Sequence, residues 1–223
     1  MKTTLTILIL FFSFSGFAQD DEIPEVSPNR YGIKAGYNAA YINNTLNTGP
    51  THKSDFHLGM FKEYRFDSFA LQPEVVYSRQ GCNTNYRGHY YYYTGETKLN
   101  LSYLTVPVLI KGIIANKLSF YTGIQPGILI AAKEKGTADD RRENGGMKEI
   151  NTSVTENYNG FDFAIPVGFE VIFSKTISTS FRYTHGLTDI NADLEIEKYR
   201  DWAGLGKKRM KNQVFQISLQ YFL

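Results

Sequence analysis

Cysteine is almost absent from this sequence, since Cys82 is the only one among 223 residues. A single cysteine excludes an intramolecular disulfide and a cysteine-based zinc site. The chain also lacks an excess of one charge, with 24 basic against 22 acidic residues. This balance argues against nucleic acid as a partner, which favours a basic stripe. The four histidines lack metal-ligand spacing, and there is no G-x-S-x-G nucleophile motif. We therefore expect no metal, no cofactor and no catalytic residue.

Long apolar runs are lacking beyond the N-terminus. After Lys2, the stretch Leu5–Phe14 is mostly apolar, and Gly16-Phe17-Ala18 has the small-x-small form of a signal-peptidase site. The run is shorter than the ~18 residues that a spanning helix needs. We therefore predict a signal peptide over residues 1–18, cleaved after Ala18, and an exported protein. Residues 19–29 hold two prolines and four acidic residues, which indicates an extended periplasmic linker.

Alternation of apolar and polar side chains is abundant, and it is the pattern of β-strands. It covers eight segments, over about residues 30–41, 54–64, 68–80, 98–112, 117–131, 160–173, 176–187 and 212–223. The connections between them alternate long and short. Outer-membrane barrels have short periplasmic turns and long external loops, and their strands span the membrane with ~9–11 residues. We therefore predict an all-β fold, an eight-stranded antiparallel up-and-down transmembrane β-barrel, over residues 30–223.

The polar face of these segments carries charges of both signs and several glycines. Three acidic and three basic residues on it form a predicted interior charge network: Lys34, Glu63, Glu74, Lys111, Glu170 and Arg182. The interior of an eight-stranded barrel is narrow, and buried charges persist there when they are paired. A catalytic cluster of Glu63, Glu74, Glu170 and Arg182 is the less favoured interpretation. The apolar face has Tyr and Phe near the strand ends, as in the aromatic girdles at membrane interfaces. A soluble barrel with its apolar face inside is the alternative.

Four prolines lie within the predicted strands, where they cannot donate a hydrogen bond to the ladder. We interpret Pro73, Pro107, Pro126 and Pro166 as bulge positions. The tyrosine-rich run His89–Gly95 lies in a predicted external loop. It either continues the flanking strands, with tyrosines at the lipid headgroups, or forms a platform for carbohydrate or aromatic contacts; we favour the first. Two further loops mix charges, which is typical of solvated loops or of contact with a polar protein partner.

The chain ends in NQVFQISLQYFL, an alternating segment that continues to the last residue. We predict that it closes the barrel by pairing with the first strand, because closure leaves no free sheet edge. Its lipid-facing row is predicted to be Phe215, Ile217, Leu219, Tyr221 and Leu223.

Several segments, among them LQPEVVYSRQG, LSYLTVPVLIKG, FDFAIPVGFEV and SFRYTHGLTDI, resemble a small outer-membrane β-barrel family of Bacteroidetes that includes PorT-like proteins. The resemblance spans about residues 30–223 and implies an eight-stranded barrel without implying a single activity. One branch of that family is associated with type IX protein secretion. The resemblance also implies that the C-terminal row is the signal read by the outer-membrane insertion machinery. Thr105 and Leu223 depart from the family's pattern.

The sequence as a whole predicts a non-enzymatic, integral outer-membrane barrel with a structural or interaction role through its external loops. Its expected partners are outer-membrane lipid, the insertion machinery and an extracellular or secretion-system protein, without nucleic acid. The alternatives are an accessory of type IX-like secretion and a narrow channel or transporter. A soluble ligand-binding barrel is the least favoured.

Overall fold

A computed structural model describes residues 29–44, 51–86, 93–115, 117–140, 146–192 and 209–223. The predicted signal peptide, its cleavage site after Ala18 and the linker up to residue 28 lie outside these ranges. Within them, no helix is long and apolar enough to cross a membrane. The elements are β1 (Asn29–Asn44), β2 (Lys53–Arg65), β3 (Phe69–Tyr86), β4 (Tyr93–Thr105), β5 (Val108–Ala115), β6 (Leu118–Asp140), β7 (Met147–Ser153), η1 (Thr155–Asn157), β8 (Phe161–Ile172), β9 (Ile177–Gly186) and β10 (Met210–Phe222).

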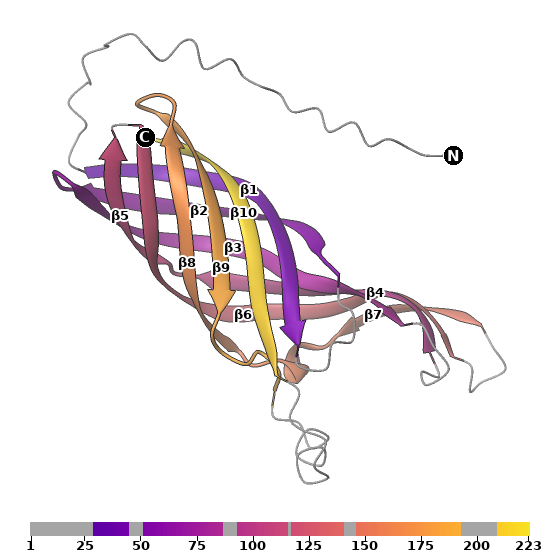
Figure 1. Cartoon of the computed structure of the whole chain (residues 1–223). Helices are drawn as coiled ribbons and strands as arrows, with labels where there is room; N and C mark the ends of the chain where they lie inside the picture. Colours follow the sequence, from indigo (N-terminus) through magenta and orange to yellow (C-terminus); the bar gives the residue numbers. More distant parts are fainter. Residues whose placement is uncertain (1–28, 45–50, 87–92, 116, 141–145, 193–208) are drawn as a thin grey trace, which may run out of the picture.

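The strands form one antiparallel sheet that returns to its own beginning (Figure 1). The order runs β2-β1-β10-β9-β8-β6-β4-β3, and a further pairing of β2 with β3 completes the ring. β10 pairs with β1 from Gly32↔Phe222 to Asn44↔Met210. The all-β barrel fold and the pairing of the last strand with the first are thus as predicted.

β4 and β5 occupy one position in the barrel wall, so the described wall has eight strands. Both pair with β3 and β6, and the register continues across the interruption at Val106 and Pro107. The Val106 amide still donates to the carbonyl of Pro126 at 2.9 Å, and the Glu74 amide donates to the carbonyl of Pro107 at 2.8 Å. The segment predicted as a single strand over 98–112 therefore behaves as one strand that lacks one donor.

The interpretation of the prolines as bulges is wrong. Register shifts occur instead at Ser102/Tyr103 and at Ile113/Ala115. A proline removes a donor but keeps its carbonyl, so the ladder can pass it without an inserted residue. The ladders keep one register on either side of Pro73, Pro107, Pro126 and Pro166.

The outer parts of β4 and β6 extend well past the length that spans a membrane. β6 has 23 residues, about twice the ~9–11 of a spanning strand, and its outer end pairs with β7. The sequence predicted a loop over much of this region. Tyr93–Gly95 belong to β4, as the favoured interpretation of the tyrosine-rich run predicts, whereas His89–Tyr92 lie outside the described residues. These outer parts project from the long-loop end of the barrel (Figure 1).

The apolar face of the strands points outward and the polar face points inward. On β10, Ile217 is 49% and Leu219 60% exposed, whereas Ser218 between them is 2% exposed. The same alternation runs along β1, β2, β8 and β9. This direction contradicts the soluble alternative, in which the apolar face would lie inside. It is the arrangement that a lipid environment favours.

Candidate functional site

The interior near the short-turn end holds a first cluster of paired charges. Arg30 donates from Nε to Glu63 Oε1 at 3.1 Å. Lys111 donates to Glu63 Oε2 at 2.8 Å and also pairs with Glu170. Ser178 completes the cluster by donating its hydroxyl to Glu170 Oε1 at 2.5 Å. The carboxylates and cations are buried and matched two to two, so this cluster is neutral.

A second cluster is centred on Glu74, on β3. Arg182 on β9 binds this carboxylate through two nitrogens, at 3.0 and 2.8 Å. Lys34 on β1 donates to it at 3.1 and 3.2 Å, and Gln72 donates at 2.7 Å. The two-nitrogen contact is the geometry that fits a guanidinium to a carboxylate best. The cluster ties together three strands that are far apart in the sequence.

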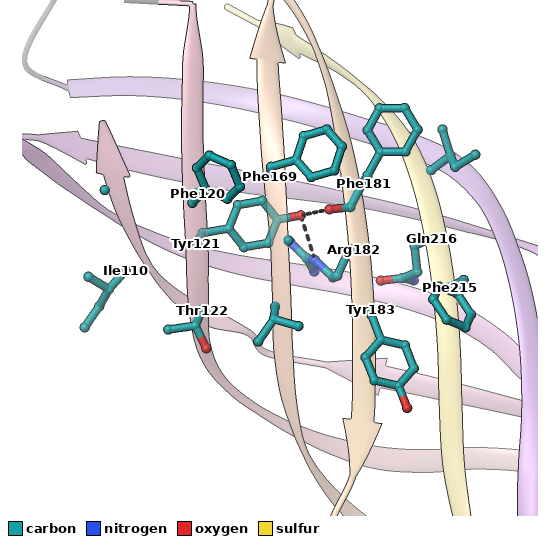
Figure 2. A pocket seen from close by; sticks show the side chains of 14 residues that line it. Ile110, Phe120, Tyr121, Thr122, Phe169, Phe181, Arg182, Tyr183, Phe215 and Gln216 are labelled. Atoms are coloured by element: carbon teal, nitrogen blue, oxygen red, sulfur yellow. Dashed lines mark hydrogen bonds between the residues drawn. The ribbon is translucent and has the colours of Figure 1, made fainter. Parts of the chain in front are cut away.

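Tyr121 fills the space that Gly168 leaves on the neighbouring strand. The two residues are directly paired between β6 and β8, and a Cβ atom built on Gly168 would lie 2.7 Å from the Tyr121 ring. The Tyr121 hydroxyl donates to the backbone carbonyl of Phe181 at 3.2 Å and accepts from Arg182 Nε at 3.5 Å (Figure 2). The glycine therefore makes room for a ring that supports the Glu74–Arg182 pair.

The pocket drawn in Figure 2 lies where Tyr121 and Arg182 meet the apolar outer surface of the wall. Phe120, Phe169 and Phe181 line it, together with aliphatic side chains of the outward face. The rings of Phe169 and Phe181 are stacked with centroids 4.9 Å apart. Because these side chains belong to the outward apolar face, we regard the pocket as part of the lipid-facing surface.

A neutral polar cluster lies further along the interior. His57 contacts Asn38 Oδ1 at 2.7 Å and Ser218 Oγ at 2.8 Å through its two ring nitrogens. Gln216 donates to the same Asn38 oxygen at 2.8 Å. Gly36, paired directly with His57, leaves room for the imidazole. His57 is thus a hydrogen-bonded interior residue. In the part of the chain that the structure describes, no group of three or more His, Cys, Asp or Glu side chains could hold a metal.

The outer mouth of the barrel is filled by apolar side chains. Leu101, Tyr103 and Ile190 are almost completely buried there. Ile190 lies between β9 and β10, and its amide donates to the carbonyl of Met210 at 2.9 Å. Val154 and Tyr158, from the segment around η1, pack against the same cluster. Its buried members are Ile42, Cys82, Leu99, Leu101, Tyr103, Leu129, Ala132, Ile190 and Met210.

The structure buries all six residues of the predicted charge network and divides them between two clusters. Lys34, Glu74 and Arg182 lie in the second cluster, and Glu63, Lys111 and Glu170 lie in the first. Sequence reasoning missed Arg30, although it has the same strand parity as Lys34. With Arg30 included, four basic and three acidic residues meet in these clusters, so the expected balance of three against three is wrong.

The apolar mouth was also missed. Leu99 and Leu101 share the inward parity of Tyr103, so the inward face of β4 changes from polar to apolar toward the outer end. That change was visible in the sequence.

The sequence matches a family model described as an outer membrane protein beta-barrel domain over residues 17–192. The chain belongs to this family. The family places the protein in the outer membrane, with its apolar belt toward lipid. No curated protein matches the sequence.

Three solved structures are among those similar to this chain. Neisserial surface protein A is 10% identical with a TM-score of 0.48, covering 86% of this chain and 96% of that one. Ail, the attachment invasion locus protein of Yersinia pestis, is 10% identical with a TM-score of 0.45, covering 87% and 99%. The outer membrane protein OprG from Pseudomonas aeruginosa is 14% identical with a TM-score of 0.45, covering 87% and 96%.

Proposed function

We propose that this protein is a closed outer-membrane barrel with a structural or interaction role and no catalysis. The observation that carries the proposal is the filled interior. Two buried charge clusters, a hydrogen-bonded cluster around His57 and an apolar mouth succeed one another along the barrel. Interiors of eight-stranded barrels are just wide enough for side chains to fill. A narrow channel or transporter is therefore less favoured than a closed barrel.

The interaction role is assigned to the sheet that projects from the long-loop end. Its outermost strand, β7, is almost entirely exposed and pairs with β6 along one edge. An extracellular or secretion-system protein is the partner that we propose for this part of the molecule. The PorT-like assignment and the type IX secretion role rest on the sequence resemblance alone. The signal peptide with cleavage after Ala18 stays a prediction as well.

Reconstitution into planar lipid bilayers tests the closed barrel. We expect the full mature chain to insert without producing a steady ionic current, because the charges in the two interior clusters are paired and side chains fill the interior. Faster migration of unboiled than of boiled protein in gels is the control, since it reports a folded barrel. A steady single-channel current from protein that passes this control would contradict the proposal.

A further inference from the structure

Three lysines gather on the outward face of the projecting sheet. Lys98 on β4 lies directly opposite Lys135 on β6, and Lys133 is the next outward residue of β6 toward the barrel. All three are exposed. Asn100, opposite Lys133, donates its side-chain amide to the carbonyls of Lys98 and Lys133, at 3.1 and 3.2 Å. We call Lys98, Lys133 and Lys135 the lysine patch; Asn100 fixes the two strands that carry it.

The lysine patch places like charges against each other. Directly opposed residues of an antiparallel pair have Cβ atoms about 4.5–5.5 Å apart, and like charges at such positions destabilise the sheet. Among the described residues, no ion pair joins these three lysines to a carboxylate. An anion bound to the patch would remove this repulsion.

Acidic residues on the same face lie further from the barrel. Glu96 on β4 and Glu149 on β7 both lie opposite Thr137 of β6, which follows Lys135 in the outward row. The order along the sheet, starting from the barrel, is therefore basic and then acidic. A ligand that reaches the lysines from the barrel side avoids these carboxylates.

The lysine patch continues directly from the lipid-facing surface. The outward row of β6 from Phe120 to Ile130 is apolar except at Thr122, with Ile124 and Ile128 at least half exposed. That stretch is about the 9–11 residues with which a strand spans a membrane. Lys133 follows at its outer end, where long basic side chains reach headgroups while their stems stay on apolar surface.

We propose that Lys98, Lys133 and Lys135 bind the phosphates of lipid headgroups in the outer leaflet, and that the occupant is a phosphorylated glycolipid of the lipid A type. The inference rests on the outer-membrane placement within the proposed function, but not on the closed interior. Phosphate oxygens accept charge-assisted hydrogen bonds from ammonium groups. The occupant's acyl chains would lie along the apolar row that ends at Ile130.

Native mass spectrometry of the full mature chain in detergent tests this site. The probes are bis-phosphorylated lipid A and the same lipid with its phosphates removed. We expect the protein to retain the phosphorylated lipid at least ~10-fold better, since each basic residue near a charged membrane surface contributes about a factor of 5. The combined Lys98→Gln, Lys133→Gln and Lys135→Gln variant should lose that preference.

The matched control removes three basic residues at the opposite end of the barrel, with Arg65→Gln, Lys117→Gln and Lys175→Gln. It should keep the preference, and all variants should keep heat-modifiable migration. A preference that survives in the lysine-patch variant overturns the proposal. Displacement of the lipid by inorganic phosphate at equal concentration overturns the lipid as occupant.

Thermal unfolding gives an independent measurement. Without added lipid, Lys135→Gln should unfold at or above the wild-type temperature, because the repulsion with Lys98 is gone. Phosphorylated lipid should raise the unfolding temperature of the wild type and not that of the lysine-patch variant. A lower unfolding temperature for Lys135→Gln without lipid, or an equal rise in both proteins, counts against the site. A current in bilayers would contradict the closed barrel but would not bear on lipid binding at the lysine patch.

Discussion

Glu74 receives hydrogen bonds from Lys34, Gln72 and Arg182 in the middle of the barrel. Its side chain is buried, as are those of the two cations. Burying such ions carries a large desolvation penalty, which their mutual attraction offsets only with good geometry. The net contribution of the Glu74 ion pairs to the free energy of unfolding is therefore small compared with the loss that follows when Glu74 or one of its cations is removed. Because the three charges come from β1, β3 and β9, they also fix how these strands are arranged across the barrel.

The substitution Glu74→Gln removes the negative charge and keeps the shape of the side chain. Lys34 and Arg182 would then be buried cations without a carboxylate partner, and we expect a loss of about 3–5 kcal/mol in the free energy of unfolding. Urea denaturation in phospholipid vesicles, followed by circular dichroism, measures it. Glu156→Gln, at an exposed position of η1, is the matched control and should change stability by less than about 0.5 kcal/mol. Equal midpoints for the two variants would disprove the role given to Glu74.

The strands are the scale at which the sequence was most informative. Period-two alternation located all eight wall strands, because one face of every strand meets lipid and the other meets a polar interior. It also placed Lys111 and Glu170 on the same, polar face of their strands. It could not show which direction each face points, nor that the charges form two clusters, because those depend on closure of the ring.

Two features could not be predicted from the sequence: the strand structure of the projecting sheet and the burial of Ile190. β7 and the outer end of β6 carry mixed charges without an apolar row, so their strand structure depends on pairing with a neighbour and not on a buried face. Ile190 lies between two strands, and its burial depends on how the chain crosses the mouth. Neither feature has a local pattern. Arg30 and Leu101, in contrast, follow from strand parity and were predictable.

Glycines on the inward and outward faces should respond differently to the same change. A Cβ on Gly168, on the inward face of β8, would lie 2.2 Å from the carbonyl oxygen of Phe181. A Cβ on Gly112, on the outward face of β5, would meet nothing nearer than 4.0 Å. We expect Gly168→Ala to lose about 1–3 kcal/mol of unfolding free energy through overpacking. Gly112→Ala should be neutral or gain up to about 1 kcal/mol, since alanine suits a strand interior better than glycine. Vesicle-based urea titrations compare them, and a larger loss at Gly112 would show that the two faces are misassigned.

At the scale of the whole molecule, the seam between β1 and β10 turns an open sheet into a ring. The last residues of the chain make this seam at the short-turn end. The Phe222 ring meets Phe61 edge-on at 5.3 Å and lies 3.7 Å from the guanidinium of Arg30. The Leu223 amide donates to the carbonyl of Tyr31 at 2.9 Å. The outward residues of β10 remain exposed beside these contacts, so one short segment presents a lipid-facing row and closes the wall.

Deletion of Tyr221–Leu223 tests whether that row is also the insertion signal. Loss of the seam contacts alone should weaken folding of the purified chain in detergent but leave a fraction that migrates as a folded barrel. If the insertion machinery reads the row, the same deletion should abolish recovery from the outer membrane in cells, a defect larger than the one measured in detergent. Leu223→Phe keeps both the seam and the apolar row and should insert normally. Fractionation of outer membranes, with unboiled gels for each variant, measures both effects. Normal insertion of the truncated chain would show that Tyr221–Leu223 are needed neither to close the barrel nor as an insertion signal.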